Sequence, residues 1–458
     1  MSDKETYNST DEGQYSTGLY KQHQSGHGGG GGKTVIENSD SYIHGSGMYE
    51  FGNSHGNDAF DGYNTGSDTG DGPDPCLLLS ILESAVRQQH DETTKAASTK
   101  TSSSIPEDIQ RNHREHLEQT WKAIRTQWLW AHETSEERSI GARCRGEEDL
   151  APLHLICKLA SNPPSDIFNE ILRVAPEVTG CVDTHGWLPL HHACIHGAST
   201  EVLKLLTQVH PDSTSALDAH HRTPLHLYAT RGTSDHYNPA TLAANFNILC
   251  SAHVDGDKNM NILMSPAEVR DKSGMVPMHY CCAYGTTKSV LRVMEEAFPE
   301  SLESTDDHGR TPLHFVMVNS QRDASPGVLG YLLGNRDDGD DTNPEESRSI
   351  VNVTPRARHT ASVNVRDNEG NLPLHLLNLG LVGIDFDQDP DKLWNVSECL
   401  KLYLEARPHV STDFLAALQA LPDALQDVAV VSPHVRNILN AKIIQRFPTS
   451  ILVSFQVT

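Results

Sequence analysis

Residues 306–314 read Asp-Asp-His-Gly-Arg-Thr-Pro-Leu-His, and the closing Pro-Leu-His of this stretch recurs along the chain. Asp306 lies six residues before the proline and Gly309 three before it, and such a pair favours a tight turn. Pro312 suits the first turn of a helix, where its missing N–H is not needed. The stretch therefore predicts a turn that leads at once into a helix, and the apolar residues that follow predict that this helix is buried.

Six copies of this motif stand in the sequence, one of them with Met in place of Leu. The intervals between successive motif prolines are 37, 35, 53, 35 and 61 residues, which indicates a unit near 35 residues with two long insertions. A period in this range is typical of a solenoid built from stacked repeats. The structural motif residues are Pro152, His154, Pro189, His191, Pro224, His226, Pro277, His279, Pro312, His314, Pro373 and His375.

Each unit is predicted to hold a turn, a helix A and a following helix B. Glycines eight residues after the motif proline predict the end of helix A, and a second run of apolar residues predicts helix B. Prolines thirteen residues before the next motif proline predict where helix B ends. The third copy has His221 at the turn glycine position, and the first copy, with Gly146 and Asp149 exchanged, is degenerate. The glycines are Gly197, Gly232 and Gly285, and the prolines are Pro176, Pro211 and Pro299.

The unit resembles the ankyrin repeat, whose signature is Thr-Pro-Leu-His-x-Ala after a turn, with two antiparallel helices. The resemblance covers residues 147–411 and implies an all-α solenoid of about six repeats. Thr223 and Thr311 complete the four-residue core of the signature. We expect the other four helices to lack a hydroxyl cap and to be weaker by about 1 kcal/mol each. Their residues at the Thr position are Ala151, Leu188, Val276 and Leu372.

The segments outside the repeats differ in composition. Residues 1–75 are rich in Gly, Ser and Asn, which predicts a disordered tail. Residues 76–146 are expected to hold a short helix, a Ser/Thr/Lys linker over 91–104 and a long amphipathic helix over 107–137. This long helix would cap the first repeat or, as an alternative suggested by Trp130, bind a partner. Residues 412–458 are expected to form a helical cap at the other end.

Two insertions, residues 236–265 and 335–363, are expected to be loops on the surface of the array. The second contains Asp337-Asp-Gly-Asp-Asp341 and should be solvated. Such loops can gate a binding face or carry a modification. The alternative is that neither insertion has a function, because long surface insertions cost little free energy and are tolerated. This alternative is at least as well supported.

Composition excludes several classes of function. Lys+Arg number 36 and Asp+Glu 61, so the net charge of −25 disfavours nucleic acid and anionic membrane as partners. No apolar run reaches about 18 residues, which gives no indication of membrane contact. The nine cysteines contain no CxxC pair, which favours reduced thiols over a disulfide framework or a zinc site. We therefore expect an intracellular protein, cytoplasmic or nuclear.

Catalytic and cofactor signatures are not found in the sequence. The stretch from Gly28 to Thr34 misses the phosphate-binding GxxxxGK[ST] loop by one residue, because His27 stands where the first Gly belongs. Six of the 26 histidines belong to the repeat motif, where the ankyrin resemblance assigns them to hydrogen bonds between turn and helix. We therefore expect no enzyme, no cofactor, no metal site and no small-molecule substrate.

The resemblance implies a protein-interaction scaffold or adaptor that binds partner proteins on the concave face of the array, through turn tips and helices A. An alternative is a regulatory or targeting subunit that docks an enzyme or membrane complex under the control of its tail and acidic loop. Partner identity is not encoded in the motif. The candidate partner-binding residues, each just after the turn glycine or its equivalent, are Trp187, Arg222, Met275, Arg310 and Asn371.

Overall fold

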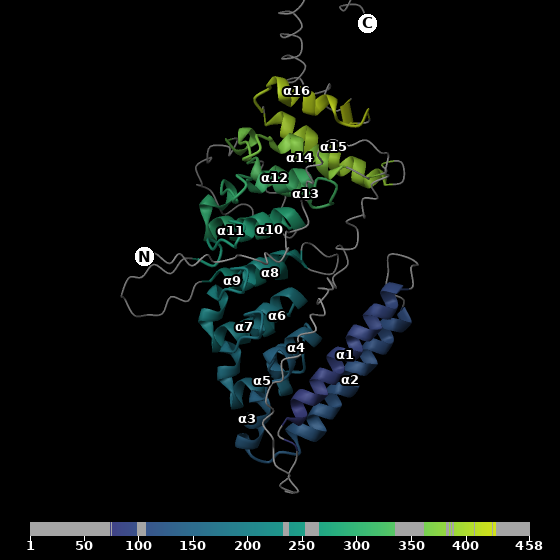
Figure 1. The fold of residues 1–458 in the computed structure, drawn as a ribbon, viewed down its shortest axis with the longest axis vertical. Coiled ribbons are helices and arrows are strands. Elements are labelled where there is room, and N and C mark those ends of the chain that lie inside the picture. Colours follow the sequence, from purple (N-terminus) through teal and green to yellow (C-terminus); the bar gives the residue numbers. More distant parts are fainter. Residues whose placement is uncertain are drawn as a thin grey trace, which may run out of the picture. The chain divides into compact units, whose positions relative to one another are not determined.

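The computed structural model describes residues 74, 76–98, 107–231, 238–251, 265–334, 361–381, 384, 386, 389–406, 408–423 and 425–426. These residues form α-helices joined by turns and short 3₁₀ segments, with no strand among them (Figure 1). The predicted disordered tail up to residue 73, the acidic stretch of the second insertion and the predicted cap beyond residue 426 lie outside the described residues.

Six helix pairs follow one another along the described chain, one for each copy of the motif. Every helix A begins at its motif proline, as expected for a residue that fits the first helical position. The helix A and helix B of the six repeats are α4 (Pro152–Leu159) with α5 (Ser165–Val174), α6 (Pro189–His196) with α7 (Thr200–Val209), α8 (Pro224–Ala229) with α9 (Pro239–Cys250), α10 (Pro277–Tyr284) with α11 (Lys288–Ala297), α12 (Pro312–Val318) with α13 (Ser325–Leu332), and α14 (Pro373–Gly380) with α15 (Pro390–Glu405).

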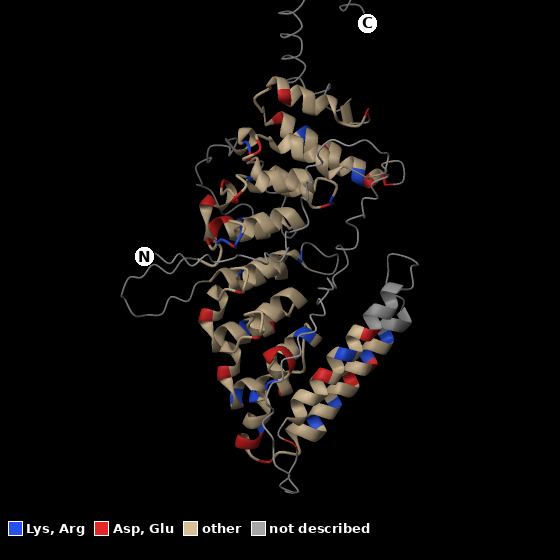
Figure 2. Ribbon diagram, in the orientation of Figure 1, with Lys and Arg blue, Asp and Glu red and all other residues tan. Residues whose placement is uncertain are grey.

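Helices of the same kind stack on one another. Each helix A contacts the helix A of the next repeat, from α4 through to α14 (Figure 1). Most helices B do the same, as in the contacts of α9 with α7 and α11. The helices A carry hardly any charge, whereas α1 (Leu77–Ser98) and α2 (Glu107–Ile124) carry charges of both signs on their coloured part (Figure 2). The core of the array is therefore the seam between neighbouring repeats, where helices A are buried on most of their surface.

Prolines end helices B where the sequence predicted. α5, α7 and α11 stop two residues before Pro176, Pro211 and Pro299, and a 3₁₀ turn begins at each of these prolines. Proline has no N–H to continue the helical hydrogen-bond ladder, so the chain leaves the helix there. Of the predicted helix A stops, Gly197 and Gly285 are the C-caps of α6 and α10, and Gly232 lies outside the described residues.

The N-terminal region differs from the sequence prediction in three respects. α1 continues through residues 91–98, which were expected to be a linker. The expected helix over 107–137 is divided into α2, a π turn over Arg125–Leu129 and α3 (Ser135–Arg143). The division follows from a capping box, in which Thr134 Oγ1 accepts from the Glu137 N–H at 3.2 Å and Glu137 Oε2 accepts from the Thr134 N–H at 3.3 Å.

The third difference concerns the cap itself. α1, not the 107–124 helix, packs on α4 in the layer of helices A, while α3 packs on α5 in the layer of helices B. α1 and α3 thus take the places of a helix A and a helix B ahead of the first motif, with α2 packed against α1. Trp130 is 67% exposed, so it does not contribute to this packing.

The predicted insertion 236–265 is partly helical. Asn238 caps α9 by accepting from the Ala240 N–H at 2.9 Å, and Pro239 takes the first helical position. α9 is therefore helix B of the third repeat, and this part of the insertion is a regular element of the array. At the other end, α16 (Thr412–Gln419) stacks on α14 in the position of a further helix A.

Candidate partner-binding surface

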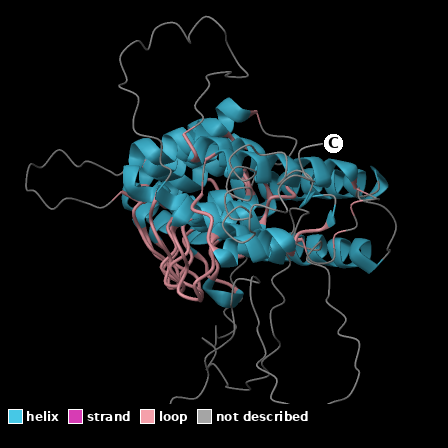
Figure 3. Cartoon of the chain, turned by 90° about the horizontal axis from the view of Figure 1, so that it is seen from above, coloured by secondary structure: helices cyan, strands magenta, loops and turns pink. Residues whose placement is uncertain are grey.

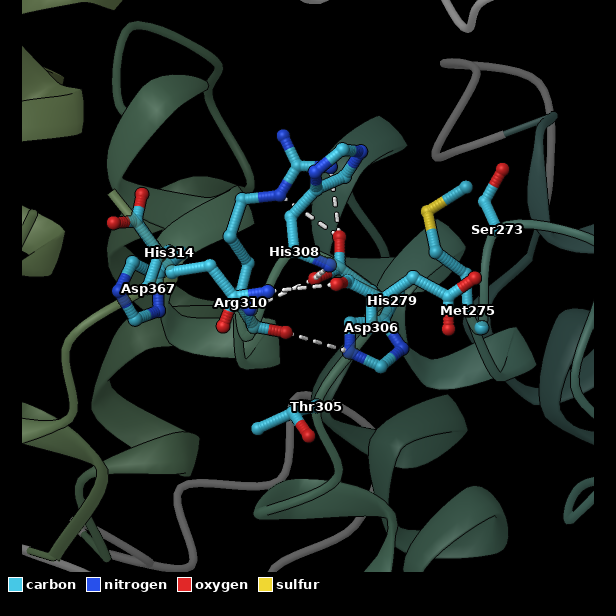
Figure 4. Close-up of polar contacts among 12 residues, drawn as sticks. Ser273, Met275, His279, Thr305, Asp306, His308, Arg310, His314 and Asp367 are labelled. Atoms are coloured by element: carbon cyan, nitrogen blue, oxygen red, sulfur yellow. Dashed lines mark hydrogen bonds and ion pairs between the residues drawn. The ribbon is translucent and has the colours of Figure 1, made fainter. Parts of the chain in front are cut away.

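The turns between repeats are each organised by one aspartate. Asp306 Oδ1 accepts from the backbone N–H groups of His308, at 2.9 Å, and Arg310, at 2.7 Å (Figure 4). The turn aspartates of the second, third, fourth and sixth repeats make the same two bonds, to the residues two and four positions later. These aspartates are Asp183, Asp218, Asp271 and Asp367, all buried.

Backbone hydrogen bonds also connect each turn to the next. The Asp307 N–H donates to the Ser273 carbonyl of the preceding turn at 3.0 Å, and the Asn368 N–H donates to the His308 carbonyl at 2.8 Å. The turns accordingly lie together on one side of the helices (Figure 3). The remaining bonds of this series are Thr184 N–H to Glu148 O, Ala219 N–H to His185 O and Lys272 N–H to His220 O, at 3.0–3.2 Å.

Four of the five predicted anchor residues are held by turn aspartates. Arg310 donates from Nε to Asp306 Oδ2 at 2.8 Å, and Arg222 makes the equivalent bond to Asp218 at 2.9 Å. Their side chains are only 12% and 17% exposed. Asn371 Nδ2 donates to Asp367 at 3.1 Å, and the Trp187 indole N–H donates to Asp218 at 3.2 Å. These side chains therefore stabilise the turns and present only part of their surface.

Met275, the fifth predicted anchor, is buried. It is 4% exposed, so the expectation of an exposed Met275 at a turn tip is wrong. In this repeat the second oxygen of the turn aspartate, Asp271 Oδ2, accepts from the Tyr280 hydroxyl at 2.7 Å, and no arginine or asparagine stands at position 275. A thioether has no strong donor for the carboxylate, so Met275 packs inward with the apolar residues.

Burial and neighbouring positive charge shift the pKa of the turn carboxyl groups in opposite directions. Burial alone would raise the pKa of the Asp218 carboxyl, but the positive charge of Arg222 and its hydrogen bonds hold that pKa below its usual value. The pKa of Asp183 is also lowered, because hydrogen bonds from His192 and from backbone N–H groups outweigh desolvation by burial. Both carboxylates therefore stay ionised inside the turns.

The motif histidines link each repeat to the next. Nδ1 of His279 accepts from the Val276 N–H at 3.0 Å, and Nε2 donates to the carbonyl oxygens of Ser304 and Arg310 at 3.1 and 3.2 Å (Figure 4). This pattern requires the neutral imidazole with its proton on Nε2. Desolvation by burial lowers the pKa to about 4 for the five motif histidines His154, His191, His226, His279 and His314.

The motif threonines do not cap their helices, contrary to the sequence prediction. Thr223 Oγ1 lies 2.9 Å from His226 Nδ1, and its helix receives no side-chain cap from it. In all six repeats the backbone N–H of the residue before the motif proline donates to Nδ1 of the motif histidine. This bond forms whether or not that residue is Thr. The four repeats without Thr therefore keep this capping bond.

The side chains that project from the turns are those one and two residues after each turn aspartate. Their backbone forms the series of bonds between turns, and most of their side chains are exposed. Sequence reasoning missed them, because the ankyrin resemblance directed attention to the position after the glycine. The exposed members, which we call the tip residues, are Thr184, His185, Ala219, His220, Lys272, Asp307, His308, Asn368 and Glu369.

The buried cysteines of the array are thiols of raised pKa. Burial raises the pKa of the thiols of Cys157, Cys194, Cys281 and Cys282, which keeps them protonated and poorly nucleophilic. Among the residues that the structure describes, no group of three or more His, Cys, Asp or Glu side chains is placed to hold a metal ion. None of the described helices is both long and apolar enough to cross a membrane.

Comparison with known proteins gives one structural likeness and no family match. No protein-family model matches the chain. Among solved structures, the chain is similar to the crystal structure of the ankyrin repeat domain of Bcl-3, titled a unique member of the IkappaB protein family, with 17% sequence identity and a TM-score of 0.37. The match covers 62% of this chain and 99% of that one. With six Pro-Leu/Met-His motifs, each opening a helix pair after an aspartate- or glycine-containing turn, the chain folds as an all-α ankyrin-repeat solenoid.

Proposed function

We propose that this chain is a non-catalytic scaffold or adaptor that binds partner proteins on the face formed by its turns and helices A. The observation that carries the proposal is the row of tip residues, which are exposed while the backbone beneath them is fixed by two sets of hydrogen bonds. Side chains on a rigid backbone lose little conformational entropy on binding, which favours recognition of a folded or extended protein segment.

The chemistry of the tip residues favours a polar protein partner. Three of the five residues two positions after a turn aspartate are histidines, His185, His220 and His308, and the fourth and fifth are Ser273 and Glu369. Lys272 and Asp307 add one charge of each sign. A mixed surface of this kind suits hydrogen bonds with a protein and lacks the positive charge needed for phosphate backbones.

The partly covered faces of Trp187, Arg222, Arg310 and Asn371 border the row of tip residues. We propose that they contribute the inner edge of the contact. Because these four side chains also hold the turns, replacing them weakens the fold as well as any partner contact. The tip residues offer the cleaner test, because the bonds between turns run mainly through their backbone. The side chain of Asn368 is an exception, since its Nδ2 donates to the Asp307 carbonyl of the preceding turn at 2.8 Å.

The test is site-specific photo-crosslinking in cells. A photoreactive residue replaces His308 at a turn tip in one variant of the full chain and Lys204, an exposed residue of helix B α7, in another. We expect a crosslinked protein at 308 and not at 204. A triple variant His185→Ala, His220→Ala and His308→Ala should then lose that partner while its helical circular dichroism is unchanged. Crosslinks confined to 204, or full capture by the triple variant, would move the binding face elsewhere.

The proposed location is intracellular, cytoplasmic or nuclear, which is supported by nine cysteines without a disulfide among those described. The regulatory or targeting alternative depends on residues 1–75 and on the acidic insertion. Deleting residues 1–75 separates the two functions, because a scaffold that binds through its turns keeps its partner after the deletion and a tail-controlled subunit does not.

A further inference from the structure

Two cysteines meet in the N-terminal cap. Cys76 lies just before α1, and Cys144 is the C-cap residue of α3. A hydrogen bond with the Cys76 side chain is among the causes that raise the pKa of the Cys144 thiol, which places the two thiols next to each other. Both are partly exposed, and neither is joined in a disulfide.

The approach of these cysteines belongs to a longer contact between α1 and the chain after α3. One turn further along α1, Gly146 lies against Leu79 and Glu83, so closely that a methyl group at Gly146 would overlap the Glu83 carboxylate. The Glu147 N–H donates to Glu83 Oε1 at 3.3 Å, and Arg87 reaches the Glu147 carboxylate at 3.2 Å. The chain that follows Cys144 is therefore held against the first turns of α1, which places Cys144 beside the start of this helix.

The other cysteines are in different surroundings. Six of the remaining seven are buried, and burial raises the pKa of each of their thiols. An oxidant in water reaches such thiols poorly. Cys181, the seventh, is partly exposed, and its sulfur lies 3.7 Å from the Glu177 carbonyl in a 3₁₀ turn. Cys181 therefore serves as a control of matched exposure.

We propose that Cys76 and Cys144 are an oxidation site, at which a peroxide converts the two thiols into a disulfide that joins the start of α1 to the end of α3. In the first step one thiolate attacks hydrogen peroxide, the O–O bond breaks, and a sulfenic acid and hydroxide form. In the second step the other thiol displaces the sulfenic hydroxyl, which leaves as water when the S–S bond forms. In total two thiols and one hydrogen peroxide give one disulfide and two waters.

The order of the two steps follows from the surroundings of the sulfur atoms. Desolvation by burial, followed by the hydrogen bond with Cys76, raises the pKa of the Cys144 thiol to about 12. Cys144 is therefore a weak first nucleophile, and the sulfenic acid forms on Cys76. Cys144 then acts as the resolving thiol, already in contact with its target.

The bond would fix the outermost layer of the array. α1 covers α4 and α3 covers α5, so these two helices protect the first repeat. Terminal units of a repeat array have a neighbour on one side only and are the first to open. A disulfide between positions 76 and 144 would close a long segment of the chain into a ring. It lowers the conformational entropy of the unfolded state and thereby raises the stability of this cap.

The experiment uses the full chain, treated with hydrogen peroxide and then alkylated, with intact mass and peptide mass spectrometry as readouts. We expect the intact mass to fall by two hydrogen atoms before alkylation, two fewer alkyl groups after it, and a crosslinked peptide that contains Cys76 and Cys144. The Cys181→Ser control should give the same crosslink, whereas Cys76→Ser and Cys144→Ser should not. Hydrogen exchange of α1 should slow on oxidation and recover after dithiothreitol.

Two results would overturn the proposal. One is stable sulfinic acid at Cys76 in protein that has native circular dichroism, because a thiol in contact would have trapped the sulfenic acid. The other is a crosslink that joins two chains in place of positions 76 and 144. If Cys144→Ser folds poorly, Cys144→Ala provides a second variant, and in it Cys76 should be trapped by a sulfenic-acid reagent that fails to label the wild type.

Discussion

Nε2 of His279 donates to the carbonyl oxygen of Arg310, 31 residues later, at 3.2 Å. The same ring accepts the Val276 N–H at Nδ1, so both nitrogens of one buried imidazole are used and the ring must be neutral. Bonds of this kind recur from the first repeat to the fifth. The interfaces between repeats therefore depend on the protonation state of histidine.

Acidification should destabilise the array at mildly acidic pH. The five motif histidines have pKa values near 4 when folded, against about 6.5 when unfolded. The unfolded chain binds more protons between these values, so the free energy of unfolding falls as pH drops from about 6.5 towards 4. Each histidine contributes up to about 1.4 kcal/mol per pH unit there. Urea denaturation at closely spaced pH values measures the slope.

The carboxylates act in a separate pH window. Asp183 and Asp218 have lowered pKa values, so the stability that they contribute is lost at pH below about 4, as they become protonated. His279→Gln should reduce the slope between pH 6.5 and 4 and leave the loss at lower pH unchanged. A slope equal to that of the wild type would show that His279 titrates normally in the folded chain.

The turn aspartate should matter more for stability than its arginine partner. Asp306→Ala leaves two backbone N–H groups and the Arg310 guanidinium without their acceptor, and we expect a loss of about 3 kcal/mol or more. Arg310→Ala keeps the two backbone bonds and should cost about 1–2 kcal/mol. The double variant should be no less stable than Asp306→Ala alone, as a double-mutant cycle by chemical denaturation can check. Equal losses for the two single variants would contradict this ranking.

Glycine at position 221 should stabilise the third repeat. His221 adopts a left-handed conformation with φ of 60°, where the turns of the second, fourth, fifth and sixth repeats have glycine. Such a conformation costs a residue with a side chain roughly 1 kcal/mol, and His221→Gly should recover about that amount in thermal or urea unfolding. Gly370→Ala provides the reverse test, because φ is +86° there and no atom lies within 4 Å of the added methyl group. This variant should lose about 1 kcal/mol, and a gain would contradict the argument.

Close packing of α12 and α14 should make Gly380 intolerant of a side chain. A methyl group at Gly380 would overlap the Val318 carbonyl oxygen, so Gly380→Ala must move one helix and should cost about 1–3 kcal/mol. The matched control is Gly327→Ala in α13, where the nearest atom is Lys288 Cε at 4.0 Å. That change should be neutral or stabilising by up to about 1 kcal/mol, since alanine favours helix more than glycine does. Circular dichroism melts of both variants compare the two sites.

The sequence predicted regular features and missed those that break the repeat pattern. Helix B of the third repeat, α9, lies inside a segment that we expected to be an insertion, because its position departs from the 35-residue period. The capping signal of Thr134 and Glu137, which starts α3, is visible in the sequence but was hidden by an apparent continuous helical pattern. Apolar spacing alone does not show where one amphipathic helix ends and the next begins.

The sequence by itself determined the number of repeats, the first residue of every helix A and the hydrogen bond that caps it. The aspartate that shapes the turn, the proline that starts the helix and the histidine that caps it lie within nine consecutive residues, so these features are local. Only the tertiary structure decided which side chains remain exposed. The acceptor of the Trp187 indole, Asp218, is 31 residues away in the next repeat, and Met275 packs inward while its counterparts Arg222 and Arg310 bind aspartates. Such partners are chosen by the stacking of repeats, which brings together residues that no local pattern connects.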